Sequence, residues 1–293
     1  MRLSAAQRLH VRKTDIAKNS HGVVVSFVLL ALLVMSFACR GTRTPAPTPT
    51  AVELTVAAAS DLTPAFEEIG REFEASEKSK VVFVFGSTGL LTRQIENGAP
   101  FDVFAAANDS YIDQLQEKGL IVPGTKTIYG RGRIVMWTTA DSPLKLEKIQ
   151  DLANPDVHRI AIANPDHAPY GQAAREALEA AGIWETVRPK LVYGDNIRQT
   201  LQFAETGNVD VAIMALSLTV QSKGRWVLIP SDLHREILQG IGVIKGTQQE
   251  EAARKFISFV SGEKGRNILK KYGFSFTGHT DTRMAFPTIL FHP

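Results

Sequence analysis

The chain has 293 residues, of which 44% are hydrophobic and 22% are charged, which excludes disorder over its whole length. The formal net charge is only +3, and much of the positive excess lies in the first 43 residues, so the remaining chain is close to neutral. Because no long basic stripe is interleaved with aromatic residues, the sequence does not indicate a nucleic-acid-binding protein.

The N-terminus has the pattern of an export signal. A basic region precedes an apolar run at residues 23–38, which is short for a membrane span, so we expect residues 1–38 to be a signal peptide. Cys39, the only cysteine, follows this run where a lipoprotein signal is cleaved and its cysteine acylated. Lipoprotein signals usually have an aliphatic residue three positions earlier, where this chain has Ser36. An uncleaved anchor and an ordinary signal peptide are therefore alternatives, and both also place the body of the protein outside the membrane.

A spacer follows the cysteine. Residues 39–51 are rich in Pro and Thr and have little apolar content to bury, so we expect the lipid-anchor cysteine to be followed by an extended linker. This predicts a protein that is exported and held at the cell membrane, on the extracytoplasmic or periplasmic side.

From residue 53, short β-type runs alternate with amphipathic helical segments, which is typical of an α/β protein with a largely parallel sheet. Helical spacing is clear where Phe66, Ile69 and Phe73 share one face. The predicted strands are residues 54–59, 81–85, 103–106, 134–138, 160–163, 191–193, 209–214, 227–229 and 241–244.

Four junctions between a strand and a helix carry the polar residues. Ligands of open α/β sheets bind beyond the carboxyl ends of strands, at helix N-termini, so these junctions are the candidate binding site. Each alone is weak, because helix-capping residues occur in every α/β protein. The junctions are Ala-Ala-Ala-Ser-Asp-Leu-Thr-Pro at 57–64, Gly-Ser-Thr-Gly at 86–89, Asn-Pro-Asp-His-Ala-Pro-Tyr-Gly at 164–171 and Gly-Asp-Asn-Ile-Arg at 194–198.

The residues of these motifs and their order along the chain resemble those of one protein family, from about residue 53 to residue 276. The most specific stretch is Arg-Gln-Ile-Glu-Asn-Gly-Ala-Pro-Phe-Asp-Val-Phe at 93–104, and Ala-Leu-Ser at 215–217 and Lys-Tyr-Gly-Phe at 271–274 also match. The chain resembles the extracytoplasmic molybdate-binding proteins of ABC importers, which are type II periplasmic binding proteins. This resemblance implies a two-lobed α/β fold with mixed, mostly parallel sheets and a two-strand hinge.

The resemblance also implies the domain boundaries and the ligand. Lobe 1 would comprise residues 52–132 and 236–276, lobe 2 residues 133–235, and residues 277–293 would form a C-terminal tail without an assigned role. A molybdate or tungstate anion would lie between the lobes and be delivered to the permease subunits of the importer, with no cofactor, no bare metal cation and a monomeric protein. The implied anion ligands are Ser60, Asp61, Ser87, Thr88, Tyr170 and Ile197, with Asn196 and Ser217 as further candidates.

Two positions bear on the identity of the anion. A carboxylate of Asp61 inside the site would repel a dianion and favour a protonated anion such as phosphate, but we expect Asp61 to cap the helix that starts at Thr63 or Pro64. One branch of the family has an anion-binding tyrosine where this chain has Ala215, and Tyr170 or Ser217 could replace it. Sulfate and phosphate remain alternative ligands.

Functions of other classes have less support. A secreted Ser-His-Asp hydrolase could use Ser60 or Ser87 with His167 and Asp166, but neither serine has a G-x-S-x-G elbow. The seven histidines are scattered without an H-E-x-x-H motif, so metal catalysis is not indicated. We therefore do not expect an enzyme, although a purely structural surface lipoprotein also remains an alternative.

Overall fold

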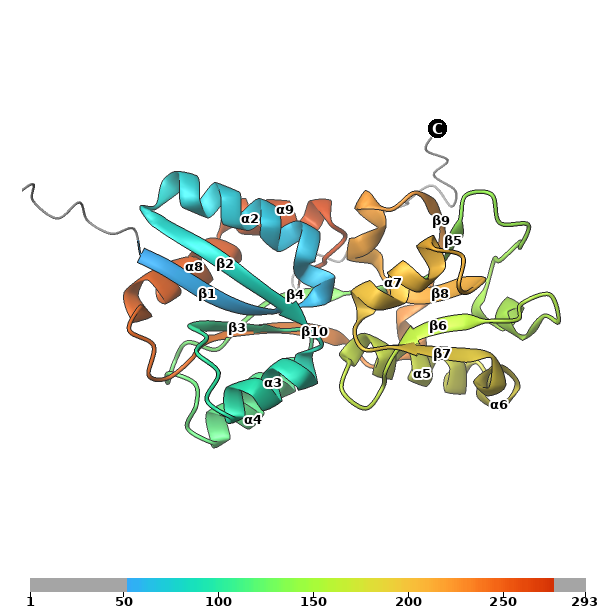
Figure 1. Cartoon of the computed structure of the whole chain (residues 1–293), viewed down its shortest axis with the longest axis horizontal. Coiled ribbons are helices and arrows are strands. Elements are labelled where there is room, and N and C mark those ends of the chain that lie inside the picture. The colour runs from blue at the N-terminus through green and yellow to red at the C-terminus, as the bar shows by residue number, and fades with distance from the viewer. Residues whose placement is uncertain (1–51, 277–293) are drawn as a thin grey trace, which may run out of the picture. The chain divides into compact units, whose positions relative to one another are not determined.

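The computed structural model describes residues 52–276 (Figure 1). The predicted signal peptide at 1–38, Cys39 with the linker at 39–51, and the tail at 277–293 lie outside the described residues. The described chain forms two five-stranded sheets, each with its own helices. We call these two parts the first lobe and the second lobe. No helix in residues 52–276 has the length and apolar character needed to cross a membrane.

The first sheet has the strand order β2-β1-β3-β10-β4. Because β10 is antiparallel to both of its neighbours while β1 is parallel to β2 and β3, four of the five strands run in the same direction. Its strands are β1 (Val52–Ala59), β2 (Ser79–Gly86), β3 (Val103–Ala106), β4 (Thr127–Gly132) and β10 (Ile237–Val243), and its helices are α2 (Thr63–Ser76), α3 (Thr88–Glu96), α4 (Ser110–Glu117), α8 (Glu250–Ser261) and α9 (Glu263–Lys271).

Helices cover both faces of this sheet because its central strands bury side chains on both sides. Val56 of β1 belongs to the core that includes Phe66 of α2 and Phe256 of α8, whereas the next residue, Ala57, belongs to the core that includes Leu91 of α3. This alternation follows from the two-residue period of a strand. In Figure 1, α2 accordingly lies above the first sheet and α3 and α4 lie below it.

The second sheet repeats this arrangement with the strand order β7-β6-β8-β5-β9. Here β5 is antiparallel to both neighbours, and again four strands share a direction. Its strands are β5 (Ile134–Thr139), β6 (Ile160–Ala163), β7 (Leu191–Gly194), β8 (Val211–Ala215) and β9 (Gly224–Leu228), its helices α5 (Pro169–Ala180), α6 (Trp184–Val187) and α7 (Ile197–Glu205). Short 3-10 helices are η1 (Ser60–Leu62), η2 (Ile149–Ala153), η3 (Arg188–Lys190), η4 (Leu216–Gln221) and η5 (Ser231–Leu233). The predicted mixed, mostly parallel α/β fold is confirmed.

The sequence prediction missed one strand and placed only two, at 103–106 and 160–163, with the exact ends that the structure has. β4, with two glycines and an arginine in six residues, has the composition of a turn, yet it pairs along β10 and buries Tyr129. β10 begins at Ile237, four residues before the predicted start, because Gln239 and Gly240 interrupt its apolar run without interrupting the strand. β8 begins two residues later than predicted and β9 three residues earlier.

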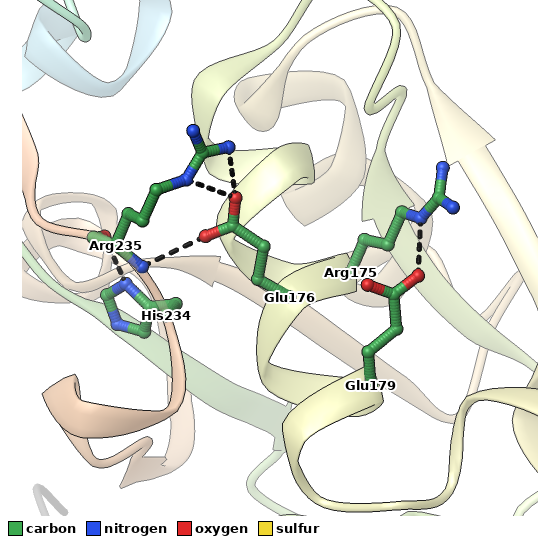
Figure 2. A network of polar contacts seen from close by, with 5 residues as sticks. All are labelled: Arg175, Glu176, Glu179, His234 and Arg235. Carbon is green, nitrogen blue, oxygen red and sulfur yellow. Dashed lines mark hydrogen bonds and ion pairs between the residues drawn. The ribbon is translucent and has the colours of Figure 1, made fainter.

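The chain changes from one sheet to the other at two places. Arg133 alone separates β4 of the first sheet from β5 of the second, and the chain returns through the segment between η5 and β10. In this returning segment Arg235 is fastened to α5, as Figure 2 shows. Its backbone N–H donates to Glu176 Oε2 (2.9 Å) and its Nε to Glu176 Oε1 (2.7 Å). The start of β10 is thereby fixed beside the helix that carries Tyr170.

Candidate functional site

The strand register brings the predicted junctions to one edge of each sheet. Ala59 at the end of β1 pairs with Gly86 at the end of β2, so the next residues, Ser60 and Ser87, follow neighbouring strand ends. In the second sheet Ala163 pairs with Gly194, so the junctions at 164–171 and 194–198 are also neighbours. These are the carboxyl ends of the parallel strands, the position at which open α/β sheets bind ligands.

Contacts between the lobes join the junctions in pairs. The first junction meets the second lobe at η4, where the Ser217 hydroxyl donates to the Asp61 carbonyl (2.7 Å), and η1 also contacts α7. The second junction meets the third, where the Gly89 N–H donates to the His167 carbonyl (2.9 Å). The structure therefore brings all four predicted junctions together at the interface between the lobes.

Ser60 and Thr88 offer hydroxyl donors on the first lobe. Both side chains are buried, with 3% and 1% of their surface exposed. Thr88 Oγ1 accepts from the Ala107 N–H (3.1 Å), which leaves the hydroxyl proton of Thr88 for another acceptor. The Ser60 carbonyl accepts from the Thr63 hydroxyl (2.8 Å), whereas the Ser60 hydroxyl has no partner in the described part of the chain.

Tyr170 and Ile197 offer backbone donors on the second lobe. Tyr170 is the second residue of α5, after Pro169, and Ile197 is the first residue of α7. N–H groups in the first turn of a helix have no acceptor within it and suit an anion. Asn196 caps α7, because its Oδ1 accepts from the N–H groups of Arg198 and Gln199, both at 3.0 Å. The side-chain oxygen of Asn196, a further candidate ligand, is therefore used in the cap, whereas the Ile197 N–H stays available.

Ser87 and Ser217 are engaged across the lobe interface. The Ser87 hydroxyl donates to the His167 carbonyl (2.9 Å) and lies 2.8 Å from His167 Nδ1. Ser217 gives its proton to the Asp61 carbonyl, as described above. Both serines are buried beside the predicted ligands, but in this arrangement their hydroxyl protons are used to connect the lobes.

The interpretation of Asp61 as a helix cap is wrong. No side chain caps η1 or α2, and the Asp61 carboxylate instead accepts from Gln239 Nε2 at its Oδ2 (3.1 Å). Its Oδ1 is buried and has no partner within residues 52–276. Burial raises the pKa of Asp61 from 3.8 to about 7, although the neighbouring Tyr170 and Gln239 side chains act in the opposite direction. The carboxyl group is therefore largely protonated below neutral pH.

A buried polar network, which the sequence analysis missed, surrounds Asp61. Gln239 of β10 donates to Tyr170 OH (3.3 Å) as well as to Asp61, and its Oε1 accepts from Tyr129 OH (3.0 Å). The Tyr170 ring packs against Gly132, where a Cβ atom would lie 2.1 Å from the hydroxyl oxygen. One signal was available, since Gln239 is the only strongly polar residue in the sequence Ile-Leu-Gln-Gly-Ile-Gly-Val of β10.

Charged groups lie at the edge of this site. Arg131 forms an ion pair with Glu236 (3.2 Å). Arg198 lines a cavity of about 450 Å³ together with Pro64 of the first lobe. Within residues 52–276, no three His, Cys, Asp or Glu residues are grouped so that they could hold a metal ion.

This geometry offers neutral donors from both lobes at one interface. Hydroxyl protons of Ser60 and Thr88 and N–H groups of Tyr170 and Ile197 suit a small ligand that only accepts hydrogen bonds. The helix N-termini add a favourable partial positive charge. Together with the repeated sheet topology, these features define a two-lobed binding protein with its ligand site at strand carboxyl ends.

Comparison with known proteins identifies the family. The chain belongs to the bacterial extracellular solute-binding proteins, whose family model matches residues 54–275. It is 34% identical to the molybdate-binding protein ModA of Rhodobacter capsulatus over 224 residues, which cover 76% of this chain and 88% of that protein. It is 32% identical to ModA of Escherichia coli strain K12 over 230 residues, covering 76% and 89%. These findings confirm the resemblance predicted from the motifs.

A solved structure supports the same assignment. The periplasmic molybdate-binding protein of Azotobacter vinelandii matches with a TM-score of 0.73 and 27% identity, covering 77% of this chain and all of that one. The expected periplasmic-binding-protein fold is thus found in a solved relative. The family match at residues 54–275 includes all four junctions of the candidate site.

Proposed function

We propose that this protein is the substrate-binding component of an ABC importer and that it binds molybdate, or tungstate, between its two lobes. The observation that supports this best is the donor set at the lobe interface, with Ser60 and Thr88 from one lobe and the N–H groups of Tyr170 and Ile197 from the other. The relatives named above as molybdate-binding proteins support the same ligand. The bound form would deliver the anion to the permease subunits.

The donor set suits a tetrahedral dianion for a chemical reason. A fully ionised oxyanion has acceptors and no protons, so a site made of donors satisfies it without a counter-charge. Phosphate at neutral pH still carries a proton and would need an acceptor. The raised pKa of Asp61, which results from burial, reduces the negative charge that this carboxyl group would otherwise bring near a dianion. Sulfate is also fully ionised and is the alternative ligand.

We propose that neither the Tyr170 hydroxyl nor the Ser217 hydroxyl replaces the family tyrosine, whose position is taken by Ala215. The Tyr170 hydroxyl accepts from Gln239 Nε2 and lies beside the Asp61 carboxyl group in the buried network, and the Ser217 hydroxyl donates to the Asp61 carbonyl. Ala215 itself is completely buried in β8. We therefore expect the Asp61 N–H, next to Ser60 in the first junction, to serve as a fifth donor.

We propose a transport role without catalysis. The Ser87 hydroxyl meets His167 Nδ1 as in a hydrolase pair, but Ser87 also donates to the backbone of that same histidine. The Asp166 backbone N–H bonds to Asn164, and no Asp166 carboxylate contact orients the imidazole in the described chain. A purified protein that hydrolyses a nitrophenyl ester, with the activity lost in Ser87→Ala, would contradict this role.

The proposed location is the outer face of the cell membrane, with a diacylglycerol-modified Cys39 as the tether and a monomeric body. The proposal rests on the position of Cys39 after the apolar run at 23–38. Cys39→Ser should move the protein from the membrane fraction to the soluble exported fraction. An unchanged membrane fraction would instead favour an uncleaved N-terminal anchor.

Calorimetric titration with molybdate, tungstate, sulfate and phosphate tests the proposed ligand. We expect tight one-to-one binding of molybdate and tungstate, and much weaker binding of the other two. A preference for phosphate or sulfate would refute the choice of anion. Failure to bind any of the four would refute the binding role and favour a structural lipoprotein.

A further inference from the structure

The N-terminus of α3 makes a compact contact with a single residue of the second lobe. The Gly89 N–H and the Ser87 hydroxyl both donate to the His167 carbonyl, each at 2.9 Å. The Ser87 oxygen also lies 2.8 Å from His167 Nδ1, which donates to it when Ser87 gives its own proton to the carbonyl. Three hydrogen bonds therefore form here only when the lobes are together.

The absence of a side chain at Gly89 allows the backbone of His167 to approach closely. A Cβ atom at position 89 would lie 2.8 Å from the His167 carbonyl oxygen, and 3.1 Å from both its Cα and its Cβ. These three atoms are the nearest neighbours of that position, and all belong to the other lobe. The backbone of residue 89 is ordinary helix, where alanine is more favourable than glycine. Only the approach of the second lobe therefore requires glycine here.

Thr88, between these two residues, faces its own lobe. Its Oγ1 accepts from the Ala107 N–H after β3, and its carbonyl accepts from the Thr92 hydroxyl (2.9 Å). The residues of the Gly-Ser-Thr-Gly motif at 86–89 thus have different roles. Ser87 and Gly89 contact the second lobe, whereas Thr88 keeps a free proton for a ligand.

The turn that contains His167 connects it rigidly to Tyr170. Asn164 holds this turn, because its carbonyl accepts from the Ala168 N–H (2.9 Å) and its Oδ1 from the Asp166 N–H (3.0 Å). Pro169 and Tyr170 follow directly and begin α5. Fixing the His167 carbonyl therefore fixes the Tyr170 N–H, only three residues further along.

We infer that Ser87 and Gly89 are positioning residues, which hold the turn at 164–170 against the first lobe and so place the Tyr170 N–H opposite Ser60 and Thr88. They act through His167 and do not bind the anion themselves. This inference rests on the proposed function, since it concerns the same site. It replaces the sequence-based role of Ser87 as an anion ligand with a role in closing the lobes.

Gly89→Ala tests this role, because the substitution keeps the N–H and adds only a methyl group. The matched control is Gly130→Ala in β4, where the nearest atoms to an added Cβ are Phe274 Cβ at 3.6 Å and the Ser275 carbonyl at 3.7 Å, both ordinary contacts within the first lobe. Molybdate affinity is measured by calorimetry, its rates by stopped-flow fluorescence, and the melting temperature without anion.

We expect Gly89→Ala to bind molybdate at least about tenfold more weakly, as when one or two hydrogen bonds are lost, mainly through faster dissociation. Its melting temperature without anion should equal or slightly exceed that of the parent protein, because alanine favours the helix more than glycine does, and Gly130→Ala should bind normally. Equal affinity of Gly89→Ala and parent would overturn the inference. Loss of folding in Gly89→Ala without anion would also overturn it, because the methyl group should meet only the second lobe.

Ser87→Ala separates positioning from anion binding. At saturating molybdate, solution scattering should give a larger radius of gyration for Ser87→Ala than for the parent, because the lobes are held together less well. An equally compact saturated variant with weakened affinity would show that Ser87 is an anion ligand and contradict the inference. If the parent protein binds none of the four anions, the proposed function is refuted. If the parent binds molybdate but the variants behave like it, only the positioning role is refuted.

Discussion

Asp61 provides the sharpest prediction for stability, because it is a buried carboxyl group without a cationic partner. Its side chain is completely buried, it accepts one hydrogen bond from Gln239, and its other oxygen is unpaired in the described chain. The isosteric Asp61→Asn substitution imitates the protonated acid, since its amide oxygen can accept from Gln239 as Oδ2 does. The substitution therefore removes the titratable group and keeps the hydrogen bond from Gln239.

The expected effect follows from the pKa of Asp61, which burial raises from 3.8 to about 7. An acid with a raised pKa in the folded state keeps its proton there while the unfolded chain releases it, so its contribution to stability falls as pH rises from about 4 to about 7. At about 1.4 kcal/mol for each tenfold change in the dissociation constant, the upper limit is roughly 4 kcal/mol. Relaxation around the carboxylate reduces this, so we expect a change of about 1–4 kcal/mol.

Urea unfolding of parent and variant between pH 4.5 and pH 8.5 measures the effect, and the difference between the two curves cancels all other titrating groups. Tyr129 and Tyr170 face Asp61, but burial raises both of their pKa values well above the ordinary value, so they keep their protons over this range. Asp61→Asn should gain stability over the parent as pH rises and level off above pH 7. A constant difference over the whole range would refute the reasoning, and Asp156→Asn, at an exposed loop residue, is the control.

Two further predictions concern the donors and the network. Ser60→Ala and Thr88→Ala should each weaken molybdate binding by about tenfold or more in calorimetry, since a hydrogen bond to a charged group contributes about 1.5–3 kcal/mol. Ser258→Ala, on the exposed face of α8, is the control, and unchanged affinity in both site variants would show that the donors are misassigned. Gln239→Leu leaves buried groups of Asp61 and Tyr129 without partners, so urea unfolding at pH 6 should show a loss of about 2–4 kcal/mol. A loss under about 0.5 kcal/mol would mean that water replaces the amide.

The sequence predicted the parts of the site that depend on local pattern. Small residues at the end of β1, glycines at the start of α3 and the Asn196 cap of α7 all lie where a strand ends and a helix begins, and these signals extend over only a few residues. Combined with the family resemblance, they located all four junctions and the two-lobed fold. The core also followed, because the spacing of Phe66, Ile69 and Phe73 places them on the buried face of α2.

The parts that were missed depend on contacts between distant residues. The direction of the Asp61 side chain is decided by Gln239, 178 positions later, so local capping preference gave the wrong answer. The partner of Ser87 is His167, 80 positions away in the other lobe. β4 was missed because its glycines have a tertiary role, with Gly132 making space for Tyr170. Such constraints are invisible until the two lobes are placed against each other.

Diffraction from crystals grown with tungstate tests the central claim most directly, because tungsten scatters anomalously and marks the position of the anion. We predict one strong anomalous peak between the lobes, within hydrogen-bonding distance of the Ser60 and Thr88 hydroxyls and of the Tyr170 and Ile197 N–H groups. A peak elsewhere on the molecule, or no peak at saturating tungstate, would contradict capture of an oxyanion by neutral donors at this interface.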